Sequence, residues 1–159
     1  MKIINYDRKY KNEYIALNAS WIVKNFGFVE HKDIECFHNI DEYIKTGSMI
    51  FMSVDKDTLL SGCMAKKCND TEWEICRLCS NGRSDHKGTG SAVFKACMDY
   101  ALQNGAKRIF AVPDERLKAA VHICKKFGFR RSEREKSPYE RGGDVFEYIA
   151  DRNLSRTVL

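Results

Sequence analysis

The chain has no long uninterrupted apolar run, because charged residues break up each hydrophobic stretch. We therefore expect no membrane-spanning helix, which needs about 20 consecutive apolar residues. There are only two prolines in 159 residues and no low-complexity segment, so we expect an ordered chain except at its C-terminal end. At this length a single domain with a substantial core is expected, at residues 1–151, followed by a tail at 152–159.

The number of cysteines is odd, at seven, and the opening stretch MKIINYDRKYKNEY lacks the apolar core of a secretion signal. Both features favour free thiols in a reducing cytoplasm. Cys76 and Cys79 form one CxxC pair, but no further ligands follow at similar spacing, so we expect no metal site. On a regular strand these two residues would point to opposite faces, which makes them poor ligands of one metal ion. We therefore expect both to be small apolar core residues.

The net charge of +5 is only mildly basic, and the lysines and arginines are scattered. Without a basic stripe interleaved with aromatic residues, a nucleic-acid partner is not expected. A small anionic ligand suits this charge. Two common phosphate motifs are also missing: no P-loop pattern occurs, and Phe94 and Lys95 follow where the third glycine of a dinucleotide fingerprint should fall.

Hydrophobic periodicity predicts a strand at residues 2–6, a helix at about 9–25, and a second helix that Asp33 would cap and Gly47 would end. Three strand-like runs separated by short turns then predict an antiparallel meander. These runs lie at residues 49–54, 59–66 and 73–79.

The second half predicts a helix at 90–104, a strand at 108–112, a helix at 115–127 and a strand at 145–150, with a further strand near 130–133. The strand–helix–strand unit requires a right-handed crossover, so its two strands should be parallel. The expected fold class is therefore α/β (α+β). Its mixed, mostly antiparallel central sheet should have about six to seven strands, with about four helices distributed over both faces.

The stretch SDHKGTGSAVF at residues 84–94 places two glycines just before a predicted helix. A helix N-terminus has unpaired N–H groups and a partial positive charge, and glycine lets a ligand approach them closely. The amides of Gly88, Gly90 and Ser91 could hold a phosphate or pyrophosphate, helped by Lys87. A glycine-rich turn without a ligand is the alternative, and the GxG pattern alone favours it.

Three segments together resemble the GCN5-related N-acetyltransferase (GNAT) superfamily: KGTGSAVFKACMDYALQNGAKRIFAV, LKAAVHICKKFGF and SPYERGG. The family's motif Gln/Arg-x-x-Gly-x-Gly/Ala opens a helix after the fourth strand, and DHKGTG occupies these positions at 85–90. The resemblance covers roughly residues 50–150 and implies the acyl-CoA N-acyltransferase fold.

The resemblance implies that the glycine turn binds the pyrophosphate of acetyl-CoA, the cosubstrate, and it implies no metal. The pantetheine arm would lie between splayed fourth and fifth strands. Family members usually have a bulge in the fourth strand, which would break the alternation assumed above for the two cysteines. The cofactor-binding residues implied are Leu78, Cys79, Ser80, His86, Lys87, Gly88, Thr89, Gly90, Ser91 and Asp114.

The sequence departs from the family pattern at three positions. Asp85 replaces the Gln/Arg of the motif and places a negative charge near the expected phosphates, unless it caps the turn by accepting backbone N–H bonds. Asp114 stands for the usual asparagine after the fifth strand. Cys124 stands where a tyrosine often protonates the departing thiolate.

Acetyl transfer requires a neutral amine, and only about one lysine-like amine in a thousand is neutral at pH 7. Glu74, on the predicted central strand, is the candidate base, provided that burial raises its pKa. The alternative is a surface glutamate or one paired with Arg77.

The conjugate acid of a thiolate has a pKa near ~8.5, so the thiolate leaves without obligatory protonation. Cys124 could donate a proton weakly, but its place seven residues after Leu117 on an apolar stripe favours core packing. Tyr139 is the rival acid or an acceptor-site residue. The candidate catalytic residues are therefore Glu74, Cys124 and Tyr139.

The resemblance implies that Trp21, Phe26, Phe28 and His31 line or border the acceptor pocket, although Trp21 could equally be an ordinary core residue. The reaction expected is direct transfer of an acetyl group to a primary amine of a small molecule or an exposed protein amine. The alternative is a non-catalytic acyl-CoA-binding sensor or regulatory module, and a different acyl donor is a third reading. The sequence does not fix the oligomeric state, although dimers are common among relatives and a homodimer is one option.

Overall fold

The computed structural model describes residues 1–82, 88–114, 117–139 and 142–150. The described strands form one sheet in the order β1-β2-β3-β4-β5-β7-β6, in which only the β4–β5 pair is parallel. This confirms the expected mixed, mostly antiparallel sheet. The strands are β1 (Lys2–Asn5), β2 (Met49–Asp55), β3 (Thr58–Lys67), β4 (Glu72–Ser80), β5 (Arg108–Ala111), β6 (Arg130–Lys136) and β7 (Asp144–Ile149).

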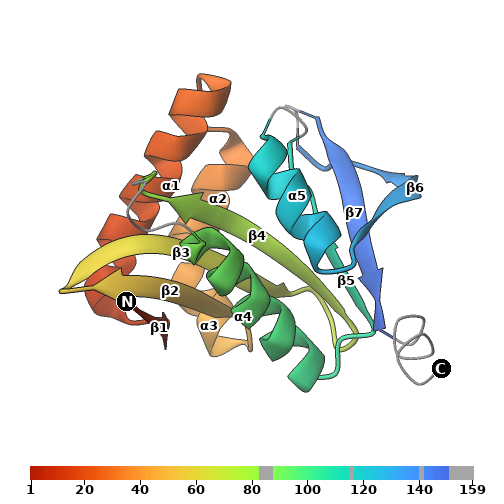
Figure 1. Cartoon of the computed structure of the whole chain (residues 1–159), viewed down its shortest axis with the longest axis horizontal. Helices are drawn as coiled ribbons and strands as arrows, with labels where there is room; N and C mark the ends of the chain where they lie inside the picture. The colour runs from red at the N-terminus through yellow and green to blue at the C-terminus, as the bar shows by residue number, and fades with distance from the viewer. Residues whose placement is uncertain (83–87, 115–116, 140–141, 151–159) are drawn as a thin grey trace.

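Helices cover both faces of the sheet (Figure 1). One core lies between the sheet and the pair α4 and α5, and the other lies between the sheet and the helices α1 to α3. None of the described helices is both long and apolar enough to cross a bilayer. The helices are α1 (Lys11–Phe26), α2 (His31–His38), α3 (Ile40–Lys45), α4 (Thr89–Gln103) and α5 (Lys118–Lys126), and a 3-10 turn at Arg8–Tyr10 precedes α1.

The second predicted helix is two helices, α2 and α3, which meet at Asn39. The Asn39 side chain donates a hydrogen bond to the Glu35 carbonyl (2.8 Å), so it satisfies the end of α2 locally and favours a break there. The predicted cap was also wrong. Glu30 is the N-cap of α2, and Asp33 lies three residues into the helix, where its Oδ2 accepts the Glu30 N–H (2.9 Å).

Strand β4 contains a bulge. Gly62 of β3 pairs with Cys79 and Met64 pairs with Cys76, so one residue on β3 faces two on β4. At the bulge Arg77 has φ 56°, a left-handed conformation that a non-glycine residue rarely adopts. The extra residue shifts the alternation, so Cys76 and Cys79 both pack in the core beneath α1 to α3. Core packing was expected for both thiols, but the expectation of opposite faces was wrong.

Tyr14 of α1 supports this bulge from the face of the sheet that α1 to α3 cover. Its hydroxyl donates a hydrogen bond to the Arg77 carbonyl (2.8 Å), and its ring lies directly over Gly62. A Cβ added at Gly62 would come within 2.5 Å of Tyr14 Cε1, closer than packed carbon atoms allow. The bulge therefore depends on a position in β3 that has no side chain.

Changing Gly62 to alanine is expected to destabilise the protein by about 1–3 kcal/mol, because the buried Tyr14 ring would have to move. Thermal unfolding of the variant measures this loss as a lower Tm. The matched control is the same change in a Tyr14→Leu background, where the added methyl group should cost much less. An unchanged Tm for Gly62→Ala alone would contradict the proposed support by Tyr14.

Candidate active site

A cleft of about 840 Å³ opens where β4 and β5 part. The two strands pair only over three residues, from Glu72 opposite Arg108 to Glu74 opposite Phe110, and then diverge. The divergence agrees with the splayed strands that the resemblance implied. Helix α1, the first turn of α4, helix α5 and the segment around Tyr139 close the sides of the cleft.

The glycine turn forms one end of this cleft. Gly88 has φ 84°, which requires glycine, and it serves as the N-cap of α4. Gly90 has no such constraint, and a Cβ there would meet only Leu78 Cδ1 at 3.9 Å among the described atoms. Neither backbone strain nor crowding requires glycine at position 90. Because Gly90 has no side chain, the amides of the first turn of α4 remain open to the cleft. Thr89 and Ser91 line the cleft beside the two glycines.

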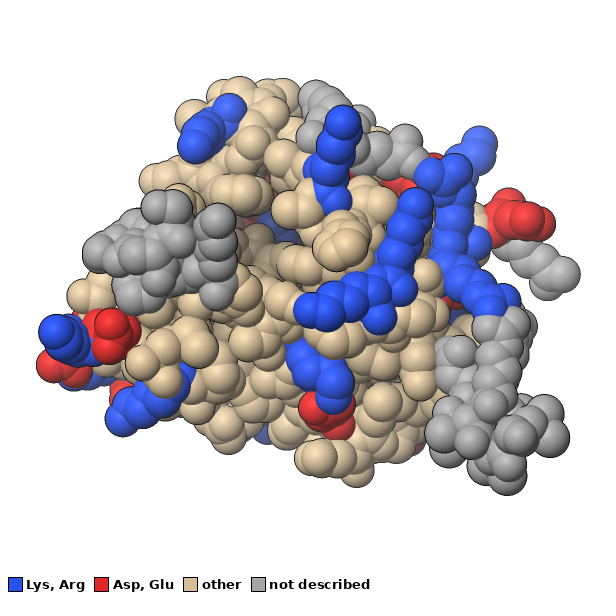
Figure 2. Space-filling view, in the orientation of Figure 1, with Lys and Arg blue, Asp and Glu red and all other residues tan. Residues whose placement is uncertain are grey.

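A basic side chain reaches this turn from α5. Lys126 Nζ donates a hydrogen bond to Ser91 Oγ (3.2 Å). The ammonium group also lies over the ring of Phe127 (5.3 Å from its centroid), which itself stacks on Phe94. Figure 2 shows lysine and arginine side chains gathered over α5 on this face. The predicted helpers His86 and Lys87, like Asp85, lie outside the described residues.

The remaining predicted cofactor residues also line the cleft: Leu78, Cys79, Ser80 and Asp114. The Cys79 thiol belongs to the core beneath α1, where Asn18 Nδ2 donates to its sulfur at 3.3 Å. Only the backbone of Cys79 is therefore free to pair with an extended ligand in the cleft, as the resemblance implied.

Glu74 is buried, with 8% of its surface exposed, on β4 just before the bulge. Burial raises the pKa of its carboxyl, and this effect is opposed by the positive charges of Lys66, Arg77 and Lys32 and by a hydrogen bond from Tyr139. The Tyr139 hydroxyl lies 3.5 Å from Glu74 Oε2. Glu74 is thus not a surface glutamate, and Arg77 forms its ion pair with Asp33 instead.

The two candidate acids differ in their surroundings. Cys124 is almost completely buried in the core beneath α4 and α5, and burial raises the pKa of its thiol to about 12. Such a thiol is a poor proton donor to a thiolate whose conjugate acid has a pKa near ~8.5. Burial and the nearby Glu74 charge raise the pKa of Tyr139 as well, so its phenol is also a weak proton donor, although its hydroxyl lies beside the Glu74 carboxyl. Both residues line the cleft, but burial favours packing for Cys124, whereas the contact with Glu74 favours an active-site position for Tyr139.

Two of the four aromatic or imidazole residues expected at the acceptor pocket line the cleft, namely Trp21 and Phe26. Phe28 is exposed and is not among the lining residues. His31 lies on the surface at the start of α2, where its Nε2 is 3.3 Å from Glu35 Oε1.

Sequence reasoning missed the roles of Arg77, Asp33 and Lys126. Arg77 and Asp33 form a buried ion pair between β4 and α2, although they are 44 residues apart in the chain. The sequence indicated this pair only indirectly, through the bulge in the fourth strand that the resemblance implied. Such a bulge redirects one side chain close to position 77. Lys126 had a weak signal as a lysine at the end of the helix that precedes the glycine–phenylalanine pair.

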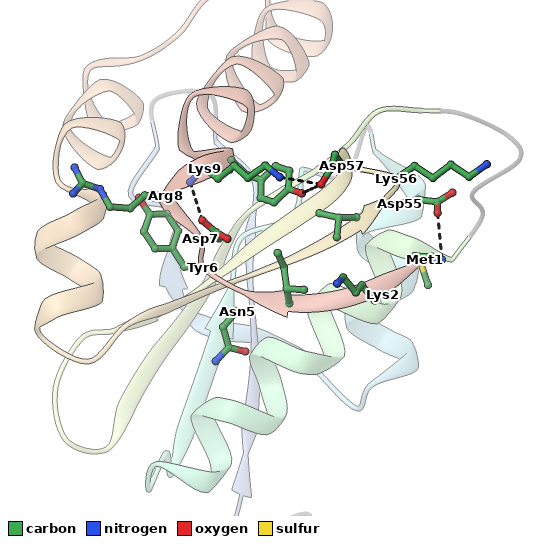
Figure 3. Close-up of a pocket in the computed structure, with 13 residues that line it drawn as sticks. Met1, Lys2, Asn5, Tyr6, Asp7, Arg8, Lys9, Asp55, Lys56 and Asp57 are labelled. Atoms are coloured by element: carbon green, nitrogen blue, oxygen red, sulfur yellow. Dashed lines mark hydrogen bonds and ion pairs between the residues drawn. The ribbon is translucent and has the colours of Figure 1, made fainter.

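A second hollow, of about 960 Å³, lies at the edge strand β1 beside the β2–β3 turn (Figure 3). Two ion pairs lie within it: Lys9 Nζ is 2.9 Å from Asp57 Oδ1, and the N-terminal amine is 3.7 Å from Asp55 Oδ1. It is separated from Glu74 by β2 and β3, so it belongs to a different region from the cleft. Across the described residues, no group of three or more His, Cys, Asp or Glu side chains is placed to hold a metal ion.

Comparison with solved structures finds the same fold at low sequence identity. A GNAT-family acetyltransferase from Staphylococcus aureus Mu50 superposes with a TM-score of 0.81 at 14% identity, covering 93% of this chain and 98% of that one. The structure of yncA from Salmonella typhimurium with its cofactor acetyl-CoA gives 0.74 at 13% identity, covering 94% and 93%. An aminoglycoside 6'-N-acetyltransferase from Enterococcus faecium gives 0.67 at 14% identity, covering 94% and 97%.

No curated protein matches the chain. The family model described as an acetyltransferase (GNAT) domain matches residues 7–149, which is most of its length. The cleft between β4 and β5, the glycine turn at α4 and this match agree with one another. The protein therefore belongs to the GNAT family of acetyltransferases, enzymes that use acetyl-CoA.

Proposed function

We propose that the protein transfers the acetyl group of acetyl-CoA to a primary amine of a small molecule or of an exposed protein site, by direct attack. The observation that carries this proposal is the buried carboxyl of Glu74, hydrogen-bonded to Tyr139 where β4 and β5 part. A carboxylate held in this position can accept the proton that an attacking amine must lose.

The open amides of the first turn of α4 lie at the end of the cleft that suits a diphosphate, and the Lys126 ammonium group lies beside them on Ser91. Strand β4 beyond its bulge offers backbone groups to the pantetheine arm. Acetyl-CoA supplies the activated thioester and a thiolate leaving group. The chain's own residues then orient the two substrates and shield the reacting end from water.

Glu74 takes the amine proton, directly or through water, as the new amide bond forms. Because its pKa is raised by burial, it is a stronger base when ionised than a surface carboxylate. Tyr139 donates a hydrogen bond to Glu74 and helps to hold the carboxylate in place. The departing thiolate requires no proton, so the step does not depend on an acid of ordinary pKa.

A non-catalytic acyl-CoA sensor is the second candidate function. The observation that favours it is Cys124, which replaces the family's proton-donating tyrosine and is buried in the core. A sensor would bind the thioester and transfer nothing.

Two measurements separate these functions. Thermal unfolding with acetyl-CoA, CoA, ATP or NAD shows which ligand binds, since about 2.7 kcal/mol is gained at a hundredfold excess over Kd. Thiol release over a panel of amines then tests turnover. Binding of acetyl-CoA without release on any amine would support the sensor, and stabilisation by ATP but by neither CoA species would overturn both.

Replacing Lys126 by alanine is expected to weaken acetyl-CoA binding roughly tenfold, because a charged hydrogen bond contributes about 1.5 kcal/mol. Titration calorimetry at low salt measures the change, and added salt should reduce the difference between the variant and the parent protein. Lys125→Ala is the matched control, since both lysines are exposed on α5 outside the cleft lining, whereas Lys126 is the one that reaches Ser91. Equal affinities for the two variants would remove Lys126 from the phosphate site.

A further inference from the structure

Arg77 is an unusual residue for the middle of a central strand. It occupies the left-handed bulge position, and its side chain is only 8% exposed. Within the described structure, its Nε is buried without a hydrogen-bond partner. A charged side chain is costly to hold in such a place unless its surroundings compensate the charge.

Asp33 holds the guanidinium group from the α2 side. Its Oδ1 pairs with Arg77 Nη1, and its Oδ2 accepts the backbone N–H of Glu30, so both carboxylate oxygens are bonded. Asp33 is fully buried. The start of α2 is thereby fixed directly to the bulge of β4.

Two aromatic rings flank the guanidinium group, with the centroids of Phe37 and Tyr139 both 5.7 Å from Arg77 Cζ. Tyr139 in turn places its hydroxyl 3.5 Å from Glu74 Oε2. A continuous series of contacts therefore runs from Asp33 through Arg77 and Tyr139 to Glu74. A planar guanidinium group suits this arrangement, because it can stack on rings while its edge is paired.

We propose that Arg77, clamped by Asp33, is a positioning residue for acetyl transfer, which holds Tyr139 against Glu74 and favours the ionised form of that carboxyl. This inference rests on the proposed role of Glu74 as the base. Arg77 does not touch the reacting atoms in this account. It acts through Tyr139 and through its charge.

Other groups also surround Glu74, and the test must separate them from Arg77. On the β5 side its neighbour in the sheet is Phe110, which does not titrate. Lys66 of β3 is opposite Glu74, and its ammonium group lies over the ring of Tyr43 (5.0 Å from the centroid). The charged or titratable groups that interact with Glu74 are Lys32 and Cys36 of α2, Lys66 of β3, Cys68 after β3, Cys76 and Arg77 of β4, and Tyr139.

The pH dependence of kcat/KM, measured on the full chain with acetyl-CoA and its best amine, tests the proposal. Asp33→Asn leaves the Arg77 charge uncompensated, so the acidic limb should move down by about one pH unit. Arg77→Met removes the charge, so the limb should move up by about one unit. Arg77→Lys keeps the charge and loses the planar stacking, so kcat should fall about tenfold with the limb in place.

A purely structural ion pair would give a different result. Asp33→Asn and Arg77→Met would then both have a lower Tm, and the acidic limbs of their pH profiles would coincide with that of the parent protein. Asp41→Asn is the matched control: Asp41 also pairs with a lysine (Lys11) and a tyrosine (Tyr6), but remote from the cleft, so its profile should be unchanged. If Arg77→Met does not fold, the limb of Asp33→Asn decides alone, and an unmoved limb overturns the proposal.

Carboxyl NMR of protein labelled with ¹³C-glutamate gives a second readout that does not need turnover. The Glu74 signal is identified by its loss in Glu74→Gln, and its midpoint should shift in opposite directions in Asp33→Asn and Arg77→Met. If no amine is acetylated, the proposed function fails while these midpoints still test the coupling. If amines are acetylated and the midpoints do not move, the coupling fails and the proposed function stands.

Discussion

Glu74→Gln is expected to lower kcat/KM for amine acetylation by about 10²–10⁴-fold, the usual contribution of a general base. Glutamine preserves the shape and the hydrogen bond from Tyr139 but cannot accept the proton. In the parent protein, activity should rise with pH through the raised pKa of Glu74, and this acidic limb should vanish in the variant. Thiol release measured between about pH 5 and 9 checks both expectations.

Glu72→Gln is the matched control. Glu72 lies two residues before Glu74 on the same face of β4, but its Oε2 is paired with Arg108 (3.0 Å). It should keep most of the activity. A Glu74→Gln enzyme that works at the full rate across the pH range would remove Glu74 from the chemistry.

The folding stability of the Glu74→Gln variant tests the role of Glu74 independently of its activity. Folding raises the pKa of Glu74, so protonation of this carboxyl stabilises the folded state. This contribution to stability is lost as pH rises through the pKa of Glu74 in the folded protein. At neutral pH a buried ionised carboxyl therefore weakens folding, and glutamine should leave Tm unchanged or higher. A loss of activity without a loss of stability distinguishes a catalytic group from a structural one.

Gly90→Val is expected to raise the Kd for acetyl-CoA about 100-fold, equivalent to losing about 3 kcal/mol of hydrogen bonds to the phosphates. The added side chain would cover the amides of the first turn of α4. The fold itself should tolerate the change, because the new Cβ meets only Leu78 at 3.9 Å among the described atoms. Titration calorimetry and thermal unfolding without ligand measure the two effects separately.

Two variants accompany this test. Gly90→Ala should bind acetyl-CoA nearly as well as the parent protein, since the family pattern admits alanine there, and should unfold at an equal or higher temperature. Ala96→Val places the same β-branched residue elsewhere on α4, outside the cleft lining, and should leave binding unchanged. Tight binding by Gly90→Val would remove the glycine turn from the cofactor site.

The local patterns in the sequence were sufficient for most of the fold. Alternating and helical periodicities located the meander of β2 to β4 and the helix α4 within a few residues, because each pattern reports burial along one element. The break between α2 and α3 was missed, since Asn39 ends a helix through its own side chain and not through the apolar pattern. The bulge of β4 was implied by the resemblance but not by the local pattern, because a bulge is fixed by contacts from other elements, here Tyr14 of α1.

The candidate site was predicted unevenly for the same reason. Glycines before a helix have a signal in the sequence, and so does a glutamate on a central strand. The burial of Glu74 and its contact with Tyr139, 65 residues further along the chain, have none. Lys126 reaches Ser91 across 35 residues, and periodicity carries no information on such meetings.

The short pairing of β4 with β5 has a consequence for the whole molecule. Among the described residues, the ladder between β4 and β5 has three residue pairs, and the main chain of β4 beyond them has no partner strand on that side. A cosubstrate that lies there as an additional strand would complete the ladder. Its concentration would then affect the stability of the folded protein, because a ligand that binds only the folded state stabilises it. At low concentrations of acetyl-CoA we therefore expect the protein to be inactive and also more easily cleaved by proteases.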